Sequence, residues 1–444
     1  MRLKPFDQRL DAFLDQYCEC FLFSGIVRVT SRGQTVYERC IGYADREKLA
    51  KVTPDTQFCF YSLSKPFCAI GLLLLAEKGL VDLEEPPGRY VPQACGFDKR
   101  ITIRSMLHHA SGMPDFNQLD DSLFAEDPRE LIARMRSVPA NFAPYENTRY
   151  SNIHFLLFAL MIENITGMPY AQYLSCKVLE PLGMHTAQVD DGGPVSQSLA
   201  RGYEMNNGQL IPVERARRGM LGAGDLLGTA DDVYCLNQAI KNRKLLLPET
   251  WKQVLTPSPI SAFGYGCSVT TWHGKRRITH NGGHTGFRTL HIQLPQEDFD
   301  IILLSNCGFG NSRVTISEAV YDAWFGLDVP AGEQNDMDTG YIRNASAAAF
   351  PDWKAQRYLL NPMEEAALLG VYEDLTLEKA GNDYCIVLGS GQRLPCYPVS
   401  PSLLKSTCID EQYPVTTAND GALCLLGRTK QNKPQSKTGK KEQR

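Results

Sequence analysis

The longest apolar stretch of the chain, Phe67 to Ala76, follows directly on the segment from Ser62 to Pro66. Its ten residues are too few to cross a membrane as a helix, so the stretch predicts a buried core helix. Proline is tolerated in the first turn of a helix, and a glycine commonly follows the last turn. We therefore expect a helix that begins near Ser64 and stops at Lys78 and Gly79.

At the start of this helix a serine and a lysine are separated by two residues, as Ser62 and Lys65. Residues i and i+3 share one face of a helix, so the two side chains can lie side by side. A desolvated lysine has a lowered pKa and can act as a base, and a helix N-terminus favours a nearby oxyanion. This is the chemistry of an acyl-serine hydrolase.

Taken alone, however, the spacing favours a simpler interpretation, an N-capping serine above a core helix. The same spacing occurs again at Ser402 and Lys405, in a short strand-like region, where we interpret it as coincidence. The remainder of the chain must therefore decide whether Ser62 is a nucleophile.

The composition is that of an ordinary globular protein, with 43% hydrophobic and 22% charged residues. A net charge of −4 gives no reason to expect a nucleic-acid partner. The 14 cysteines have neither C-x-x-C nor zinc-ligand spacing, so we expect no metal and no cofactor. Free cysteines in apolar runs fit a reducing compartment. Because no signal-peptide-like or membrane-length apolar run is present, we expect a cytoplasmic protein that does not bind membranes.

The N-terminal part of the chain alternates between helix and strand patterns. Phe6 to Phe21 has the spacing of an amphipathic helix, and a turn at 31–33 joins two predicted strands, Phe23 to Thr30 and Thr35 to Ile41. The polar segment from Asp115 to Tyr150 is expected to be a functional loop. Further helices are expected at Ile101 to Pro114 (running into a loop), Ile153 to Ile165, Tyr170 to Leu179, and Asp231 to Ile240 after a Gly-rich bend from Gly222 to Thr229.

The next part of the chain predicts a sheet. Strands are expected at Gly264 to Val269, Arg276 to Thr279, Arg288 to Leu294 and Asp298 to Ser305, with the glycine-rich segment His280 to Phe287 interrupting them. A helix follows from Ile316 to Phe325, with a capping-box pattern at Thr315 to Glu318. Helices at both ends, an antiparallel sheet and an all-helical insertion together indicate the α+β class.

Composition changes along the chain suggest four parts. Residues 1–330 form the main domain, and the polar segment 331–361 is a plausible linker. Short strands at Leu368 to Leu375, Tyr384 to Leu388, Leu403 to Ile409 and Leu423 to Leu426 predict a small β domain over 362–428. The lysine-rich end, 429–444, is expected to be a disordered tail.

Two further segments carry side chains suited to acyl transfer. Tyr150 directly precedes an apolar helix and can relay a proton if nearby cations lower its pKa, while Asn152 can hold a substrate amide. Tyr145 has the same local pattern but no helix after it, so we prefer Tyr150. His280 opens the glycine-rich segment, where a substrate backbone could approach closely and pair as an added strand. The simpler alternatives are a surface tyrosine and a polar turn.

In chain order, the segments Ser-x-x-Lys, Tyr-x-Asn and His-x-Gly resemble the serine β-lactamase-like family. That family includes class C β-lactamases, penicillin-binding D,D-peptidases, D-aminopeptidases and β-lactamase-fold esterases. The resemblance covers about residues 20–310 and extends to segments without catalytic side chains, namely Met106 to Pro114, Glu180 to Met184, Thr229 to Val233 and His280 to Phe287. It implies an antiparallel sheet flanked by helices with an all-helical subdomain, and the small β domain is similar to lipocalin-like modules of some members.

The resemblance also implies roles for individual residues. Ser62 would be the nucleophile, Lys65 would share its proton, and Tyr150 would be the general base in acylation. Asn152 would contact the acyl-side amide of the substrate. The segment His280, Asn281 and Gly282 would take the place of Lys-Thr-Gly, the backbone N–H groups of Ser62 and Gly283 would form the oxyanion hole, and His284 would be a substrate contact or a polar neighbour.

The histidine at 280, where class C β-lactamases have lysine, favours the esterase, D-aminopeptidase and D,D-peptidase-like branches. We therefore predict a serine hydrolase that cleaves an ester or amide in a small molecule or short peptide. The alternatives are a catalytically silent protein that binds a peptide or peptidoglycan fragment, and a weak β-lactamase. The sequence predicts neither the substrate nor the oligomeric state.

Overall fold

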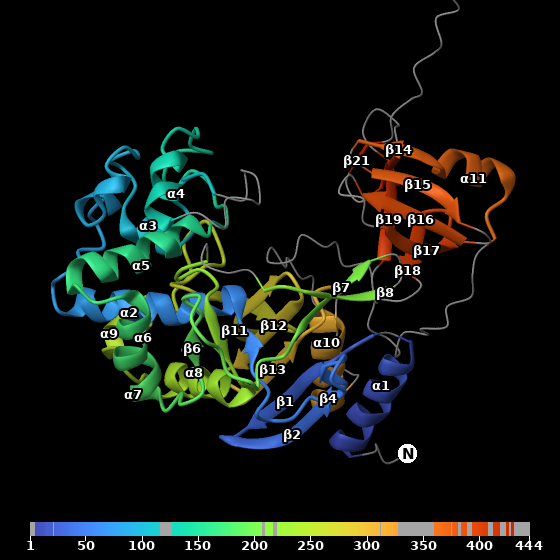
Figure 1. Ribbon diagram of the computed structural model, residues 1–444, viewed down its shortest axis with the longest axis horizontal. Helices are drawn as coiled ribbons and strands as arrows, with labels where there is room; N and C mark the ends of the chain where they lie inside the picture. The colour runs from blue at the N-terminus through green and yellow to red at the C-terminus, as the bar shows by residue number, and fades with distance from the viewer. Residues whose placement is uncertain are drawn as a thin grey trace, which may run out of the picture.

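The computed structural model describes residues 5–20, 22–115, 127–206, 209–215, 220–310, 312–326, 359–373, 375–380, 383–388, 393–406, 412–417, 423–425 and 428–429 (Figure 1). The predicted tail therefore lies outside the described residues apart from Thr429, and so does the predicted linker apart from Leu359 to Asn361.

A six-stranded antiparallel sheet forms the centre of the main domain. Its strand order is β10-β11-β12-β13-β1-β2, so the first two strands of the chain lie beside β13, the last strand of this sheet. Arg32 and Gly33 both have positive φ, 52° and 74°, in the two-residue loop between β1 and β2 that the sequence predicts. The strands are β1 (Gly25–Ser31), β2 (Gln34–Ile41), β10 (Ser268–Trp272), β11 (Lys275–His284), β12 (Phe287–Leu294) and β13 (Phe299–Ser305).

Helices cover both faces of this sheet (Figure 1). On one face, α1 (Phe6–Cys20) and α10 (Ser312–Phe325) pack on side chains such as Val27 and Val29. Ile26, just before Val27, points to the other face and belongs to the larger core, which includes residues of α8 (Ala230–Asn242). Successive residues of a strand face opposite sides, so a sheet buried on both faces needs apolar residues at nearly every position.

The larger core continues into an all-helical region. Its central pair is α2 (Lys65–Glu77) and α5 (Ile153–Thr166), both apolar on nearly every side and both predicted from the sequence. The other members are α3 (Ile103–Leu107), α4 (Pro128–Met135), α6 (Tyr170–Leu174), the π-helix η6 (Ser175–Leu179), α7 (Glu180–Leu182), α9 (Pro248–Val254) and the short 3₁₀ turns η2 (Pro87–Arg89) and η3 (Pro92–Ala94). By length and hydropathy no single helix among the described residues could span a membrane, and only α5 with the segment Tyr170–Leu182, bent by 85°, passes as a pair.

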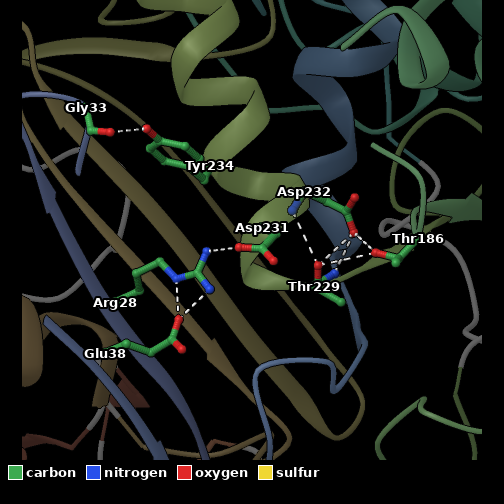
Figure 2. A network of polar contacts seen from close by, with 8 residues as sticks. All are labelled: Arg28, Gly33, Glu38, Thr186, Thr229, Asp231, Asp232 and Tyr234. Atoms are coloured by element: carbon green, nitrogen blue, oxygen red, sulfur yellow. Dashed lines mark hydrogen bonds and ion pairs between the residues drawn. The ribbon is translucent and has the colours of Figure 1, made fainter. Parts of the chain in front are cut away.

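A polar network joins the sheet to α8 (Figure 2). Arg28 of β1 is buried and forms ion pairs with Glu38 of β2 and Asp231 in the first turn of α8. Thr229 caps the same helix in a capping box with Asp232, whose carboxylate also accepts a hydrogen bond from Thr186 at 2.5 Å. Because a buried charge is costly unless it is paired, this network fixes the start of α8 against the sheet.

The described residues of the main domain also form three short sheets. β5 (Phe58–Cys59), β9 (Leu226–Gly228) and β6 (Gln188–Val189) pair in that order, β3 (Tyr43–Asp45) pairs with β4 (Ala50–Lys51), and β7 (Gly202–Asn206) pairs with β8 (Gln209–Val213). Together with α4, which lies inside the segment predicted as a loop, and α9, these small elements were not predicted.

Three predictions on the main domain are wrong. The residues from Gly264 to Cys267 precede β10 rather than forming a strand. The glycine-rich segment does not interrupt the sheet, because β11 continues through it to His284 and β12 begins at Phe287. The capping-box pattern at Thr315 does not mark a helix start, since α10 already includes Ser312.

The C-terminal region has a sheet and a core of its own. After α11 (Pro362–Leu368), the described residues form eight antiparallel strands that follow one another in chain order around a small core that includes Tyr372, Ile386 and Leu404. They are β14 (Gly370–Tyr372), β15 (Leu375–Ala380), β16 (Asp383–Leu388), β17 (Arg393–Ser400), β18 (Leu403–Ser406), β19 (Gln412–Thr417), β20 (Leu423–Leu425) and β21 (Arg428–Thr429). A β region is confirmed here, whereas the lipocalin-like assignment stays a prediction.

Candidate active site

Ser62 lies in a strained turn between a strand and a helix. The 3₁₀ turn η1 (Tyr61–Ser64) follows β5 and runs directly into α2. Tyr61 has a φ of 46°, a left-handed conformation that costs a non-glycine residue about 1–3 kcal/mol. Phe60, just before it, is held by a hydrogen bond of 2.9 Å from Thr289 Oγ1 to its carbonyl. The turn leaves Ser62 half-buried while both of its neighbours are buried.

Lys65 is enclosed and donates to three oxygens. Its Nζ lies 3.0 Å from Ser62 Oγ, 2.8 Å from Asn152 Oδ1 and 2.6 Å from the carbonyl oxygen of Ala223. Burial lowers the pKa of Lys65 to about 7, although the charges of Asp115 and Asp225 act in the opposite direction. Near neutral pH the amine of Lys65 can therefore both release and accept a proton, and its Nζ lies 3.0 Å from the hydroxyl oxygen of Ser62.

Tyr150 is the tyrosine that the structure places beside this lysine. The centre of its ring is 4.9 Å from Lys65 Nζ, and the ring stacks on His109 with centroids 4.7 Å apart. His109 is anchored in turn, because its Nδ1 accepts a hydrogen bond from the backbone N–H of Ser151 at 3.1 Å. Tyr145, the alternative from the sequence, is 39% exposed.

Asn152 occupies the N-cap position of α5, and its side chain connects Lys65 to a buried carboxylate. The amide oxygen accepts from Lys65, while the amide nitrogen Nδ2 donates to Asp115 Oδ2 at 3.2 Å. The backbone N–H of Asn152 donates to the other carboxylate oxygen of Asp115 at 3.1 Å. This network determines which way the amide of Asn152 points.

The glycine-rich end of β11 forms an open sheet edge beside Ser62. β10 pairs with β11 only as far as Thr279, so among the described residues the stretch from His280 to His284 has a strand partner only in β12. A side chain at Gly282 would place its Cβ 1.9 Å from the carbonyl oxygen of Phe60. Glycine is therefore required where β11 packs against η1. Because Gly282 contacts η1, its neighbours in the strand, Asn281 and Gly283, also lie beside this turn.

The two histidines of this strand differ in environment. His280 is 5% exposed, its Nδ1 lies 2.6 Å from the carbonyl oxygen of Asn281, and burial lowers its pKa to about 3. A neutral ring whose centre is 6.4 Å from that of Tyr150 is better suited to positioning the tyrosine than to binding a carboxylate. His284 is half-buried, with its Nδ1 2.8 Å from Thr285 Oγ1 and its ring 5.4 Å from that of Tyr61.

Comparison with known proteins identifies the family of the chain. A sequence profile of the Beta-lactamase family matches residues 10–325, most of the chain. The chain belongs to the Beta-lactamase family. It is similar to a penicillin-binding protein of Bacillus subtilis strain 168, with 27% identity over 326 residues that cover 67% of this chain and 71% of that protein. It is also similar to Esterase EstB of Burkholderia gladioli, with 29% identity over 282 residues, 54% of this chain and 72% of that protein.

A solved structure with a similar fold extends the likeness to the C-terminal region. The octameric penicillin-binding protein homologue from Pyrococcus abyssi matches with a TM-score of 0.65 and 20% identity, covering 95% of this chain and 99% of that one. The predicted family and the α+β class with its antiparallel sheet are therefore confirmed.

The second Ser-x-x-Lys segment, Ser402 to Lys405, differs in local structure from the segment Ser62 to Lys65. Lys405 lies in strand β18, and Ser402, which is exposed, comes just before it. A strand turns successive residues to opposite faces, so a spacing of three does not bring two residues together as it does on a helix.

Sequence reasoning missed three groups of the site. Asp115 holds Asn152, Ala223 accepts from Lys65, and Thr289 supports the turn before Ser62. Each is separated from its partner by at least 37 residues in the sequence, so no local periodicity relates them. The available signals were the family-like segment that ends just before Asp115, and the glycine-rich bend that contains Ala223.

Replacing Gly282 tests the packing of β11 on η1. Gly282→Ala is expected to destabilise the protein by about 1–3 kcal/mol, because backbone atoms of Phe60 and Leu63 leave no room for a methyl group. The measurement is the unfolding midpoint in urea, together with labelling of Ser62 by a fluorophosphonate. In the control Gly71→Ala the new methyl meets ordinary contacts at 3.5 Å, so stability should be unchanged or higher. Equal midpoints for the two variants would contradict the packing argument.

Proposed function

We propose that the protein is a serine hydrolase that cleaves an ester or amide bond through an acyl intermediate on Ser62. The observation that carries this proposal is the pair of Ser62 Oγ and Lys65 Nζ, 3.0 Å apart, with the lysine fully enclosed and its pKa lowered to about 7. Burying a lysine amine is costly, so a lysine with only a structural role is not expected to be desolvated beside a half-buried serine. Lowered pKa values of buried lysines are characteristic of bases at active sites.

The resemblance implies Tyr150 as the general base in acylation, whereas we assign that role to Lys65, whose Nζ is in contact with Ser62 Oγ, and assign proton delivery to the leaving group to Tyr150. The hydroxyl proton of Ser62 moves to Lys65 as Oγ attacks the substrate carbonyl carbon, and the backbone N–H groups of Ser62 and Gly283 stabilise the oxyanion. Tyr150, whose ring lies beside Nζ, passes a proton to the leaving oxygen or nitrogen as the scissile bond breaks and takes the proton of Lys65 in its place, so the amine is neutral again. A water molecule then attacks the acyl carbon and gives one proton to Lys65. Lys65 returns this proton to Ser62 Oγ as the bond between Oγ and the acyl carbon breaks, which releases the acid and restores Ser62.

The substrate proposed is a small molecule or a short peptide. The open edge of β11 offers backbone groups with which an extended chain could pair, and the glycines there allow a close approach. The half-buried Asn281 and His284 lie along this edge. The names of the relatives, an esterase and a penicillin-binding protein, support both ester and amide substrates.

The test is an activity screen with p-nitrophenyl esters, D-amino-acid amides and nitrocefin, together with mass spectrometry after a fluorophosphonate probe. We expect an adduct on Ser62 and turnover of at least one ester or amide. Nitrocefin turnover is expected to be slow or absent. Folded protein in which Ser62 stays unmodified would overturn the proposal and favour a protein that binds a ligand on the same fold without cleaving it.

The acylation rate should depend on pH through Lys65. The neutral amine is the base, so the rate of Ser62 labelling is expected to rise with pH, to reach half its maximum near pH 7 and to level off above it. An ordinary lysine would place this half-point near pH 10. The measurement is the second-order labelling rate between pH 5 and 9 with a neutral fluorophosphonate, and a rate that does not change across this range would contradict the assignment.

A further inference from the structure

Asp115 is a buried carboxylate directly behind Asn152, and no step of the proposed mechanism uses it. It is 4% exposed, and its two carboxylate oxygens accept from the backbone N–H and from the side-chain Nδ2 of Asn152 at 3.1 and 3.2 Å. Two N–H donors favour the charged form of a carboxylate, which is costly to bury without such partners.

We propose that Asp115 is a positioning residue of the hydrolase, which fixes the amide of Asn152 so that its oxygen holds Lys65 in line with Ser62. The inference rests on the proposed function of Ser62 and Lys65. Asp115 does not act on the substrate: it acts through Asn152.

The argument depends on the shape of a neutral amine. When Lys65 is uncharged it has two N–H hydrogens and one lone pair, and only the lone pair can take the proton of Ser62. The two hydrogens are bound by Ala223 O and Asn152 Oδ1, so the lone pair is left pointing at Ser62 Oγ, 3.0 Å away. If the amide of Asn152 turned over, its NH₂ group would face Lys65 and compete for the lone pair. Asp115 prevents this, because a carboxylate accepts hydrogen bonds and cannot donate them.

Asp115 is also the charge that acts most strongly on the lysine, because it is the largest of those that raise the pKa of Lys65. The titratable groups around Lys65 are Asp115, Asp225, Cys68, Tyr150, His109, His154 and His280. Burial lowers the pKa of all three histidines and raises that of Cys68, so these four groups are neutral near pH 7. Burial raises the pKa of Asp225 to about 7, so it is charged only in part. Removing the charge of Asp115 therefore makes protonation of Lys65 harder.

Asp115→Asn should change both the rate and the pH dependence of Ser62 labelling by a fluorophosphonate. An asparagine at 115 no longer enforces one orientation of the Asn152 amide, so the maximal rate should fall roughly tenfold to a hundredfold. The loss of a negative charge lowers the pKa of Lys65, so the half-point should move to lower pH by on the order of one unit. A purely structural role would reduce the amount of folded protein without moving the half-point.

Asp300 provides a matched control. Its carboxylate is also 4% exposed, but it binds Thr30 Oγ1 at 2.8 Å in the sheet and has no part in the site. Asp300→Asn should leave the half-point where it is in the natural protein. If Asp115→Asn does not fold, Asp115→Glu retains the charge and displaces the carboxylate, so the rate should fall with the half-point unchanged.

A double-mutant cycle tests whether Asp115 acts through Asn152. In an Asn152→Ala background, Asp115→Asn should lower the maximal rate no further, because the amide that Asp115 orients is gone. An equal loss in both backgrounds would overturn the inference, as would a rate and half-point in Asp115→Asn equal to those of the natural protein. If the natural protein itself is not labelled at Ser62, the proposed function fails first, so the two failures are distinguishable.

Discussion

Ser62→Ala is expected to abolish turnover of every ester or amide that the natural protein cleaves, with a loss of roughly ten-thousand-fold or more. Lys65 Nζ binds Ser62 Oγ, and its two other acceptors among the described residues, Asn152 Oδ1 and Ala223 O, cannot replace the serine as a nucleophile. The substitution removes one acceptor and leaves the other two, and Ser62 is only half-buried. Stability should therefore change by less than about 1 kcal/mol. The measurements are steady-state kinetics and the unfolding midpoint in urea.

Ser402→Ala is the matched control, because Ser402 and Lys405 repeat the sequence spacing in strand context. This variant should retain full activity and full labelling. Activity in Ser62→Ala within tenfold of the natural protein would exclude an acyl-Ser62 intermediate, whatever the control does. A loss of activity in Ser402→Ala would show that the C-terminal region takes part in the reaction.

The contrast between Ser62 and Ser402 also shows which parts of the structure the sequence could predict. Features set by local periodicity were predicted well: α1, α2 and α5 follow from apolar spacing and length, and the β1–β2 turn follows from its Arg-Gly pair. The pairing of Ser62 with Lys65 belongs to the same class, because a helical turn converts a spacing of three into a contact. The same spacing beside a strand has no such consequence.

The glycines of β11 could not be interpreted correctly from local rules. A segment with two adjacent glycines near a third predicts a loop, since glycine weakens a strand. Here the requirement is tertiary: the strand passes so close to Phe60 that only glycine fits at position 282. Packing against η1 overrides the local preference, and the resulting strand edge lies at the proposed nucleophile.

The environment of Lys65 was beyond sequence reasoning for a related reason. The expectation that the lysine is desolvated followed from its apolar neighbours, but its acceptors come from segments far along the chain. Asn152 is 87 residues away and Ala223 is 158 residues away. No pattern in the sequence connects Asp115 to Asn152, although the Asn152 side chain donates a hydrogen bond to its carboxylate.

Lys65→Met should lower the labelling rate of Ser62 by about a hundredfold to ten-thousandfold, the range for loss of a general base. Methionine fills nearly the same volume without a donor or a base, so the hydroxyl of Ser62 keeps its place and loses its proton acceptor. Asn152 Oδ1 and Ala223 O lose a donor, at a cost of about 1–3 kcal/mol for each group left buried without a partner. This cost is offset because a lysine whose pKa is lowered to about 7 is itself unfavourably buried.

The pH dependence of Ser62 labelling distinguishes the loss of the base from a distortion of the site. In Lys65→Met the rise in labelling near pH 7 should disappear, because the titrating amine is gone, whereas a site that is only distorted would keep the half-point at a lower rate. Lys275→Met is the control: this lysine is partly buried and ion-paired with Glu297 at 2.8 Å, away from the serine, and its loss should leave both the rate and the half-point unchanged. A half-point near pH 7 that persists in Lys65→Met would assign the titration to another group and overturn the role of the lysine as the base.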